Sequence, residues 1–295
     1  MGQMTLLVTG SAGYVGAAVV RTAQARGHDV RGLVRAQADL AVDDLGPFLT
    51  GVDVVIHCAA GLRGDEPRQA RDTVLATTRL IAAMLAMQPR PKLVLVSSLS
   101  VYAGDLAPGI LIDETSALEP APRSRDAYTR AKLAQEVAAT TSGLPLCIAR
   151  VGAVWGPGQL WNAHLGVPVG RLLIRLGSAG EVPLAHLQNV ALALVLAAET
   201  GDGVVNVVDD ERPSPAAYVA ALRRGGWPKL VLPLSWRILD VLGTLPIPGK
   251  PGLLRRPVLR ARMMPRRYAN ARLHALGWRP VVGFQAGLQA AQGAR

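Results

Sequence analysis

Residues 4–16 read MTLLVTGSAGYVG, and this stretch decides the fold. It opens with a short apolar run typical of a buried strand, and a helical pattern follows from Tyr14. Between them, Thr9–Gly16 spells T-G-x-x-G-x-x-G. We expect Gly10 to permit a tight turn from strand to helix, and Gly16 to let the helix pack closely on the strand. The stretch therefore predicts the first strand–turn–helix unit of an α/β sheet.

The glycine-rich turn has the features of a phosphate-binding loop. Gly13 has no side chain to keep a pyrophosphate away from the backbone, and the helix that follows offers unpaired amides and a positive dipole end. The alternative, a turn without a ligand, is weakened by its position directly after the first strand of an α/β chain. The loop residues that we expect to bind a dinucleotide are Gly10, Ala12, Gly13, Tyr14 and Val15.

Strand and helix patterns alternate along the chain, which is typical of a parallel sheet with helices on both faces. Right-handed crossovers then favour a Rossmann-type, doubly wound α/β fold. We assign residues 1–155 to this dinucleotide-binding domain and 156–295 mainly to a smaller C-terminal substrate lobe, with about 186–210 returning to the sheet. Further strands are expected at 29–35, 52–58, 92–98, 144–151 and 204–208, and helices at 14–26, 43–50, 66–87, 126–142, 189–199 and 214–224.

The composition excludes several protein classes. No apolar run approaches the roughly 18 residues that span a bilayer, and the N-terminus has no basic segment typical of a secretory signal. Two cysteines, Cys58 and Cys147, lie in apolar strand-like runs, as reduced core thiols do in cytoplasmic proteins. We therefore expect a cytoplasmic protein. No Cys and His cluster has metal-ligand spacing, so we expect no metal site.

Charge is unevenly distributed. The net charge is +11 at pH 7, yet no acidic residue follows Asp240. We call residues 241–295 the basic segment; its ten cationic residues are Lys250, Arg255, Arg256, Arg260, Arg262, Arg266, Arg267, Arg272, Arg279 and Arg295. A solvated arginine-rich face accounts for this pattern, and so does weak attraction to a membrane surface or an anionic ligand. A nucleic-acid partner is not expected.

The second expected strand ends at Arg35, on the edge where doubly wound sheets bind ligands. An acidic residue there usually holds the ribose 2′-hydroxyl of NAD, whereas a guanidinium suits the 2′-phosphate of NADP. We therefore expect NADP as cofactor, with NAD as the alternative. Asp39 and Leu40 are expected to flank the adenine, the first by hydrogen bonding and the second by packing. Arg31 lies about 13 Å back along the strand and is assigned to the surface.

Tyr128 and Lys132 lie four residues apart in an expected helix, so their side chains share one face. A tyrosine hydroxyl, with a pKa of about 10, is a poor base at neutral pH. A lysine ammonium and a cationic nicotinamide beside it stabilise the tyrosinate and lower that pKa. The same lysine can bind the ribose hydroxyls. Ser97 and Ser98 end the strand at 92–98 on the same edge, where a hydroxyl can stabilise charge on a substrate oxygen.

These features, with further motifs in the same order, resemble the extended short-chain dehydrogenase/reductase superfamily, also called the NAD-dependent epimerase/dehydratase family. The 3β-hydroxysteroid dehydrogenase and dihydroflavonol-reductase-like branches are the most similar. The matching motifs are TGSAGYVG at 9–16, HCAA at 57–60, VSSLSVY at 96–102, YTRAK at 128–132, ARVGAVWGPG at 149–158, HLQNVA at 186–191 and NARLHALGWRP at 270–280.

The resemblance implies a catalytic role for three residues. Ser98 is the catalytic serine, with Ser100 the weaker candidate, Tyr128 is the general acid/base and Lys132 is its partner. It also implies that further residues bind the cofactor and that helices around 66–87 and 126–142 pair in a homodimer. Those further residues are Ala59 and Ala60 at the ribose, and Val151 and Val154 at the nicotinamide.

The chain departs from the family pattern at three places. Arg150-Val151 stands where the family usually has Arg-Pro, and HLQNVA lacks the acidic residues of the usual motif. Thr73 stands where an Asn often serves a proton relay, which puts that relay in doubt.

The short apolar stretch Gly156–His186 has few groups to bind a diphosphate. We therefore expect an NADP(H)-dependent oxidoreductase, a ketone or aldehyde reductase or an alcohol dehydrogenase, acting on an apolar or aromatic small molecule of secondary metabolism. Leu62 and Arg63 are candidates for the edge of its site. One alternative is a sugar-nucleotide epimerase, dehydratase or reductase. The other is a non-catalytic NADP-binding sensor or scaffold.

Overall fold

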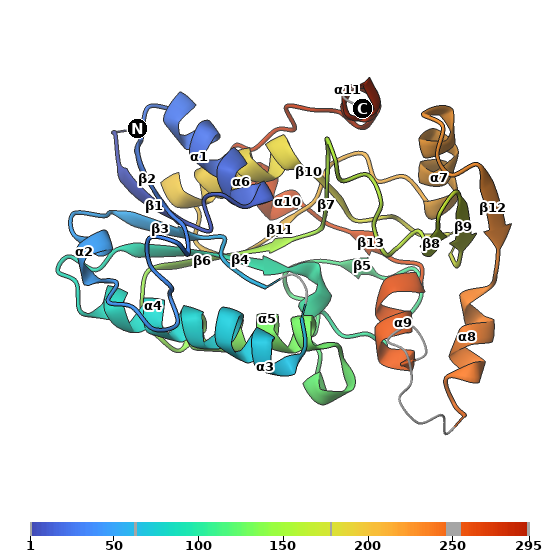
Figure 1. The fold of residues 1–295 in the computed structure, drawn as a ribbon, viewed down its shortest axis with the longest axis horizontal. Coiled ribbons are helices and arrows are strands. Elements are labelled where there is room, and N and C mark those ends of the chain that lie inside the picture. The colour runs from blue at the N-terminus through green and yellow to red at the C-terminus, as the bar shows by residue number, and fades with distance from the viewer. Residues whose placement is uncertain (1, 62–63, 178, 246–254, 294–295) are drawn as a thin grey trace.

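The computed structural model describes residues 2–61, 64–177, 179–245 and 255–293. Leu62 and Arg63 therefore lie outside the described residues. A six-stranded parallel sheet forms the centre of the molecule, in the order β2-β1-β3-β4-β6-β11 (Figure 1). This order confirms the Rossmann-type, doubly wound fold predicted from the sequence. The strands are β1 (Thr5–Thr9), β2 (Asp29–Leu33), β3 (Val54–His57), β4 (Lys92–Ser98), β6 (Leu146–Val151) and β11 (Gly203–Val207).

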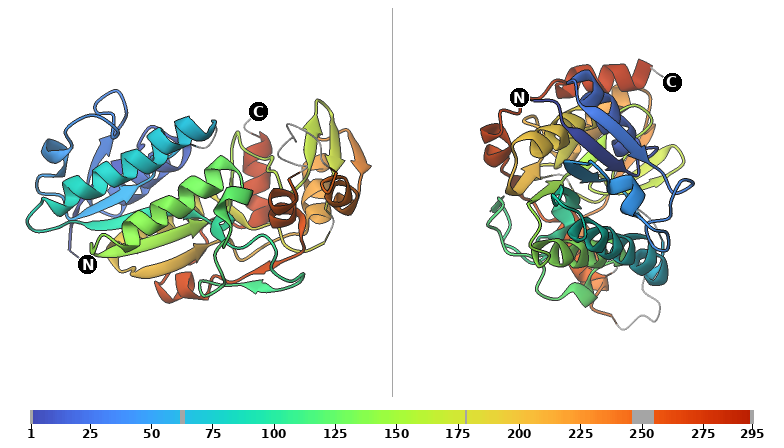
Figure 2. Two further views of the ribbon diagram at one scale, coloured as in Figure 1. Left: turned by 90° about the horizontal axis from the view of Figure 1, so that it is seen from below. Right: turned by 90° about the vertical axis from the view of Figure 1, so that its left-hand side faces the viewer.

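Helices cover both faces of this sheet, because successive strand residues are apolar on both sides. Leu6 and Leu7 of β1 are both fully buried and belong to different core clusters, one on each face. Figure 1 shows α1 and α6 on one face, and the helices α4 and α5 on the other; Figure 2 shows α4 and α5 side by side. These helices are α1 (Tyr14–Ala25), α4 (Ala76–Leu85), α5 (Ala127–Thr140) and α6 (Leu187–Glu199).

The helix predicted over residues 66–87 contains a π-helical turn that the sequence pattern did not predict. The structure divides it into α3 (Glu66–Gln69), the π-helical η1 (Ala70–Leu75) and α4. Asp65 begins it, since its side chain accepts a hydrogen bond from the backbone amide of Arg68 at 3.1 Å. Hydrophobic periodicity hardly changes across a single such turn, and for this reason the sequence shows one continuous helix.

Most of the remaining elements build the end of the molecule beyond the carboxyl ends of β4 and β6, whereas α2 packs against α4 at the opposite end (Figure 1). A parallel pairing between β5 and β13 brings Arg267 beside Leu111, residues that are far apart in the sequence. No helix in the described residues is long and apolar enough to cross a membrane. The elements are α2 (Gly46–Leu49), η2 (Leu99–Val101), β5 (Leu111–Ile112), η3 (Pro122–Ser124), β7 (Ala153–Trp155), β8 (Val167–Val169), β9 (Leu172–Arg175), β10 (Leu184–His186), α7 (Pro215–Arg224), β12 (Leu230–Pro233), α8 (Trp236–Leu242), α9 (Arg256–Met263), β13 (Arg267–Tyr268), α10 (Ala271–Ala275) and α11 (Phe284–Gly293).

Candidate active site

The glycine loop connects β1 to α1 with very little space for side chains. Gly10 has a φ of +66°, and a Cβ there would lie 2.9 Å from the Cα of Ala59. A Cβ on Gly16 would lie 2.2 Å from the carbonyl oxygen of Gly10. The amide of Gly10 donates to the carbonyl of Leu33 at 2.9 Å, so the loop is tied to the end of β2. The loop therefore needs glycine at both positions.

A cleft of about 970 Å³ opens beyond the carboxyl ends of β1, β2 and β3, and we call it the cofactor cleft. Its size is that of a site for a large small-molecule ligand. The residues predicted to bind cofactor that line it are Gly10, Arg35, Asp39, Leu40, Ala59, Ala60 and Tyr128. The other residues predicted to bind cofactor lie outside this lining, and they are Ala12, Gly13, Tyr14, Val15, Lys132, Val151 and Val154.

Two of these residues are held by specific contacts elsewhere. The hydroxyl of Tyr14 donates to the carbonyl of Pro157 at 3.1 Å, which ties α1 to the loop after β7. Val154 lies in β7 opposite Ala185 of β10 and packs against the core on the α1 side. Both residues thus support the walls of the site.

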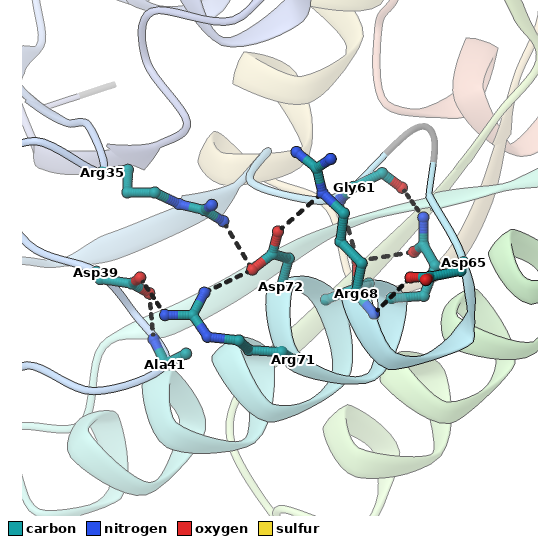
Figure 3. Close-up of polar contacts among 10 residues, drawn as sticks. Arg35, Asp39, Ala41, Gly61, Asp65, Arg68, Arg71 and Asp72 are labelled. Carbon is teal, nitrogen blue, oxygen red and sulfur yellow. Dashed lines mark hydrogen bonds and ion pairs between the residues drawn. The ribbon is translucent and has the colours of Figure 1, made fainter.

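Arg35 was predicted at the end of the second strand, but β2 ends at Leu33 and Arg35 lies in the turn that follows. Its guanidinium contacts the carboxylate of Asp72 in the π-helical turn at 3.1 Å (Figure 3). Arg68 and Arg71 contact the same carboxylate at 3.5 and 2.7 Å. The side chains of Arg35 and Arg68 are 59% and 67% exposed, so both are accessible to a ligand.

The carboxylate of Asp39 is already occupied. One oxygen accepts from the amide of Ala41 at 2.9 Å, and the other accepts from Arg71 at 2.7 Å (Figure 3). These hydrogen bonds hold the pKa of Asp39 below its usual range, the one from Ala41 contributing most. Asp39 therefore shapes the turn after β2 and connects it to η1 through Arg71.

Tyr128 lies where the cofactor cleft meets a smaller pocket, and it lines both. Asp126 begins α5 by accepting a hydrogen bond from the amide of Thr129 at 2.8 Å, which fixes Tyr128 in the first turn. Ser98, the last residue of β4, lies beside the Tyr128 hydroxyl, where it favours the tyrosinate and lowers the pKa of Tyr128. Burial nevertheless raises the pKa of Tyr128, so the free enzyme carries a protonated tyrosine at neutral pH.

Lys132 lies one helical turn after Tyr128, with its ammonium 5.9 Å from the centroid of the tyrosine ring. The ammonium donates to the carbonyl of Val96 at 2.8 Å. Burial lowers the pKa of Lys132 to about 8. The predicted Ser98, Tyr128 and Lys132 are therefore brought together at one edge of the sheet.

Behind Lys132 lies a chain of buried neutral groups. His57 contacts the hydroxyls of Thr9 at 2.7 Å and Thr77 at 2.9 Å, and burial lowers its pKa to about 3, so the imidazole is neutral. Thr73, at the position where the family often has Asn, donates to Gln69 and accepts from the amide of Gly61, both at 3.0 Å. Its hydroxyl therefore supports the loop after β3.

The smaller pocket has a volume of about 160 Å³, and we call it the substrate pocket. Ser98, Ser100, Tyr128 and Val151 line it, so the predicted Val151 lies on this side of Tyr128. Arginines from two separate parts of the chain also line it, and they are Arg125, Arg262 and Arg266. Arg262 and Arg266 belong to the basic segment, which the sequence identified only by its charge. No sequence motif therefore predicted that they would line this pocket.

Arg150, which the family follows with Pro, does not line either pocket. It forms a buried ion pair with Glu136 at 2.8 Å and also contacts the hydroxyl of Tyr102 at 3.1 Å. Glu136 also accepts from Ser97. This network joins α5 to β4 and β6, and so holds Tyr128 and Ser98 in register.

Several lining residues were absent from the sequence prediction. Arg68 and Asp72 lie four residues apart at the start of the helix after β3, which is the only local signal that could have identified them. Within the described residues, no group of three or more His, Cys, Asp and Glu side chains is placed to hold a metal ion.

The chain is similar to several known proteins. A 3-diazoavenalumate denitrifying reductase from a Streptomyces species is 31% identical, over 94% of this chain and 96% of its own. A 3β-hydroxysteroid dehydrogenase/Δ5→4-isomerase of Mycobacterium tuberculosis is 31% identical, over 70% of this chain and 65% of its own. The structure of the UDP-glucose 4-epimerase of Thermus thermophilus with NAD superposes with a TM-score of 0.71 at 23% identity, covering 99% of this chain and 98% of its own.

At 23% identity the epimerase structure shows a shared fold and nothing more. The model of the NAD dependent epimerase/dehydratase family matches residues 6–207, from β1 to the end of β11. The chain therefore belongs to the NAD dependent epimerase/dehydratase family and is an enzyme of the extended short-chain dehydrogenase/reductase type.

Proposed function

We propose that the protein is an NADP(H)-dependent reductase of a ketone or aldehyde, working in reverse as an alcohol dehydrogenase. The observation that carries this proposal is the position of Tyr128, beside Ser98 at the junction of the cofactor cleft and the substrate pocket. The name of the mycobacterial 3β-hydroxysteroid dehydrogenase supports the same class of reaction. The name of the Streptomyces denitrifying reductase supports a reduction, although of a diazo compound and not of a carbonyl compound.

The chain's own residues account for the proton. When bound, NADPH supplies the hydride that reduces the carbonyl carbon. Ser98 donates a hydrogen bond to the carbonyl oxygen and orients it, and Tyr128 gives that oxygen its proton, so that an alcohol forms. The Lys132 ammonium stabilises the tyrosinate that remains until solvent returns a proton. Because burial raises its pKa, the Tyr128 hydroxyl is protonated at neutral pH and has a proton to give.

Arg35 and Arg68 support NADP over NAD. Both are exposed cations that line the cofactor cleft at the end of β2, where the adenosine ribose binds in this fold. A 2′-phosphate placed between them would replace the contacts that both make with Asp72. NAD offers no anion at this point, and would leave the arginines paired with Asp72.

A Tyr128→Phe variant tests the proposal. NADPH oxidation with a panel of aromatic aldehydes and ketones should fall by about a hundredfold to ten-thousandfold, because the proton donor is lost. The NADPH affinity should change little. Tyr218→Phe is the matched control, since Tyr218 is buried in the C-terminal core and its hydroxyl donates to the carbonyl of Leu160 at 2.7 Å. Unchanged turnover in Tyr128→Phe would refute the mechanism.

A sugar-nucleotide enzyme is the second candidate because the epimerase structure shares the fold across the chain. The substrate pocket, with a volume of about 160 Å³, is small for a nucleoside diphosphate sugar, which favours the reductase. Thermal stabilisation by UDP-glucose in the presence of NAD, without any by NADPH, would favour the epimerase instead.

A further inference from the structure

Three arginines line the substrate pocket, and only two of them form an ion pair within the described residues. Of its three arginines, Arg125 pairs with Glu119 at 2.7 Å and Arg262 pairs with Asp126 at 2.9 Å. Arg266 takes part in none of the ion pairs found within the described residues. The carboxylates of Asp105 and Glu119 both raise the pKa of Arg266, yet neither pairs with it. The pocket therefore holds one cation without an ion-pair partner among the described residues.

Arg266 is deeply buried, with 4% of its surface exposed. One of its terminal nitrogens donates to the carbonyls of Ala103 at 3.0 Å and Gly104 at 2.8 Å, and its Nε has no partner in the part of the chain that the structure describes. Burial lowers the pKa of Arg266 more than any neighbour does, and Arg125 acts in the same direction. Asp105 and Glu119 act in the opposite direction without pairing with Arg266. A buried guanidinium hydrogen-bonded to carbonyls and not paired with a carboxylate is costly unless an anion joins it.

Two further donors in the same pocket lack partners. The hydroxyl of Ser100 and the Nε of Arg125 are both buried, and neither makes a hydrogen bond to any of the residues described. Ser100 lies two residues beyond Ser98, so these donors are grouped near the reacting groups. Unsatisfied donors beside an unpaired cation form a lining that suits an acceptor-rich anion.

We propose that the substrate of the reductase carries a carboxylate and that Arg266 pairs with it in the substrate pocket. One cation without an ion-pair partner matches a monoanion, whereas a diphosphate requires more positive charge, and a pocket of about 160 Å³ holds a small acid. The inference rests on the proposed reductase function. It revises the expected apolar substrate to an aromatic or apolar carbonyl compound with an acidic group, and it assigns the basic segment one anionic ligand.

The proposed carboxylate site can be tested by ligand binding alone, with two probes that differ only in charge. Benzoate and benzamide have the same shape and differ in charge, and their affinities for the enzyme with bound NADP⁺ can be compared by calorimetry. Benzoate should bind at least about tenfold more tightly, as expected for a charge-assisted hydrogen bond. Equal affinities would overturn the proposal, and so would pyrophosphate binding more tightly than benzoate.

Variants of Arg266 and Arg267 then show which residue causes the preference for benzoate over benzamide. Arg266→Gln should abolish the preference for benzoate, whereas Arg267→Gln should retain it, because Arg267 is the exposed neighbour in β13. Arg266→Lys keeps the positive charge and should retain part of the preference for benzoate. This variant therefore tests the proposal even if Arg266→Gln does not fold. A preference that survives Arg266→Gln in a folded protein would refute the assignment.

Turnover separates this inference from the proposed function. The value of kcat/KM should be higher for 4-formylbenzoate than for its methyl ester by about tenfold or more. Equal turnover of acid and ester would leave the reductase intact and overturn the carboxylate. Binding of benzoate through Arg266 with no reduction of any carbonyl compound would leave the anion site intact and overturn the reductase.

Discussion

The guanidinium of Arg35 and the carboxylate of Asp72 lie 3.1 Å apart across the cofactor cleft. They come from opposite walls, the turn after β2 and the π-helical turn η1. Although burial acts against it, hydrogen bonds from Arg71 and Arg35 hold the pKa of Asp72 below its usual range. Asp72 is therefore an anion paired with Arg35 in the free protein, and a 2′-phosphate bound at Arg35 would compete with it.

Arg35→Ala should weaken NADPH binding by about tenfold or more, since a charge-assisted hydrogen bond contributes about 1.5–3 kcal/mol. NADH binding should change by less than about twofold, because its ribose hydroxyl needs no cation. Fluorescence titration of both cofactors measures the two affinities. Arg31→Ala is the control, since Arg31 donates to the carbonyl of Thr50 at 2.7 Å, away from the cleft. A wild-type protein that binds NADH as tightly as NADPH would contradict the cofactor assignment.

Asp72→Asn should have the opposite effect. It removes the negative charge that competes for Arg35 and Arg68, so NADPH should bind several-fold more tightly while NADH gains little. The same titration measures this. Weaker NADPH binding in Asp72→Asn would mean that Asp72 positions the arginines for the cofactor, and the competition described above would be wrong.

The rate of reduction should depend on pH through Lys132. Burial lowers the pKa of Lys132 to about 8, so the ammonium that stabilises the tyrosinate is lost as the pH rises through that value. We expect kcat/KM to decline above about pH 8. Lys132→Arg retains a cation over this range and should remove the decline, whatever its absolute rate. A wild-type profile that stays flat from pH 7 to about 10 would exclude this role.

Glu136→Gln should destabilise the fold. It leaves Arg150 buried without its carboxylate, and breaking a buried pair in this way costs about 3–5 kcal/mol. Denaturant unfolding measures the loss in the free energy of unfolding. Glu66→Gln is the control, because Glu66 pairs with Arg130 at 3.2 Å with 73% of its side chain exposed, and its removal should cost less than about 1 kcal/mol. Equal losses in the two variants would show that the Arg150 network is not structural.

The sheet and the reacting groups were predictable because their signals are local. Thr9–Gly16 specifies a turn by its own sequence, and the four-residue spacing of Tyr128 and Lys132 fixes a shared helix face. Ser98 could be placed beside them because the carboxyl ends of parallel strands meet at one edge. The structure brings all three together at that edge.

The charged walls could not be predicted because their positions depend on contacts between distant segments. Arg266 reaches the substrate pocket because Tyr268 of β13 pairs with Ile112 of β5, and neither strand has a pattern that specifies the other. The same basic segment places Arg256 and Arg260 on Asp240, at 3.2 and 2.8 Å, so its local excess of charge is partly neutralised. The number of charged residues in the sequence does not show which arginines line a pocket and which pair with an acidic residue.

The π-helical turn η1 gives the helix after β3 one residue more than a regular helix would need. Deleting a residue there would turn α3, with Arg68, by about 100° around the helix axis relative to α4. Thr77, in α4 behind Lys132, would keep its place. A single insertion or deletion in this turn can therefore move Arg68 away from the cofactor cleft and change cofactor preference while it spares the proton chemistry.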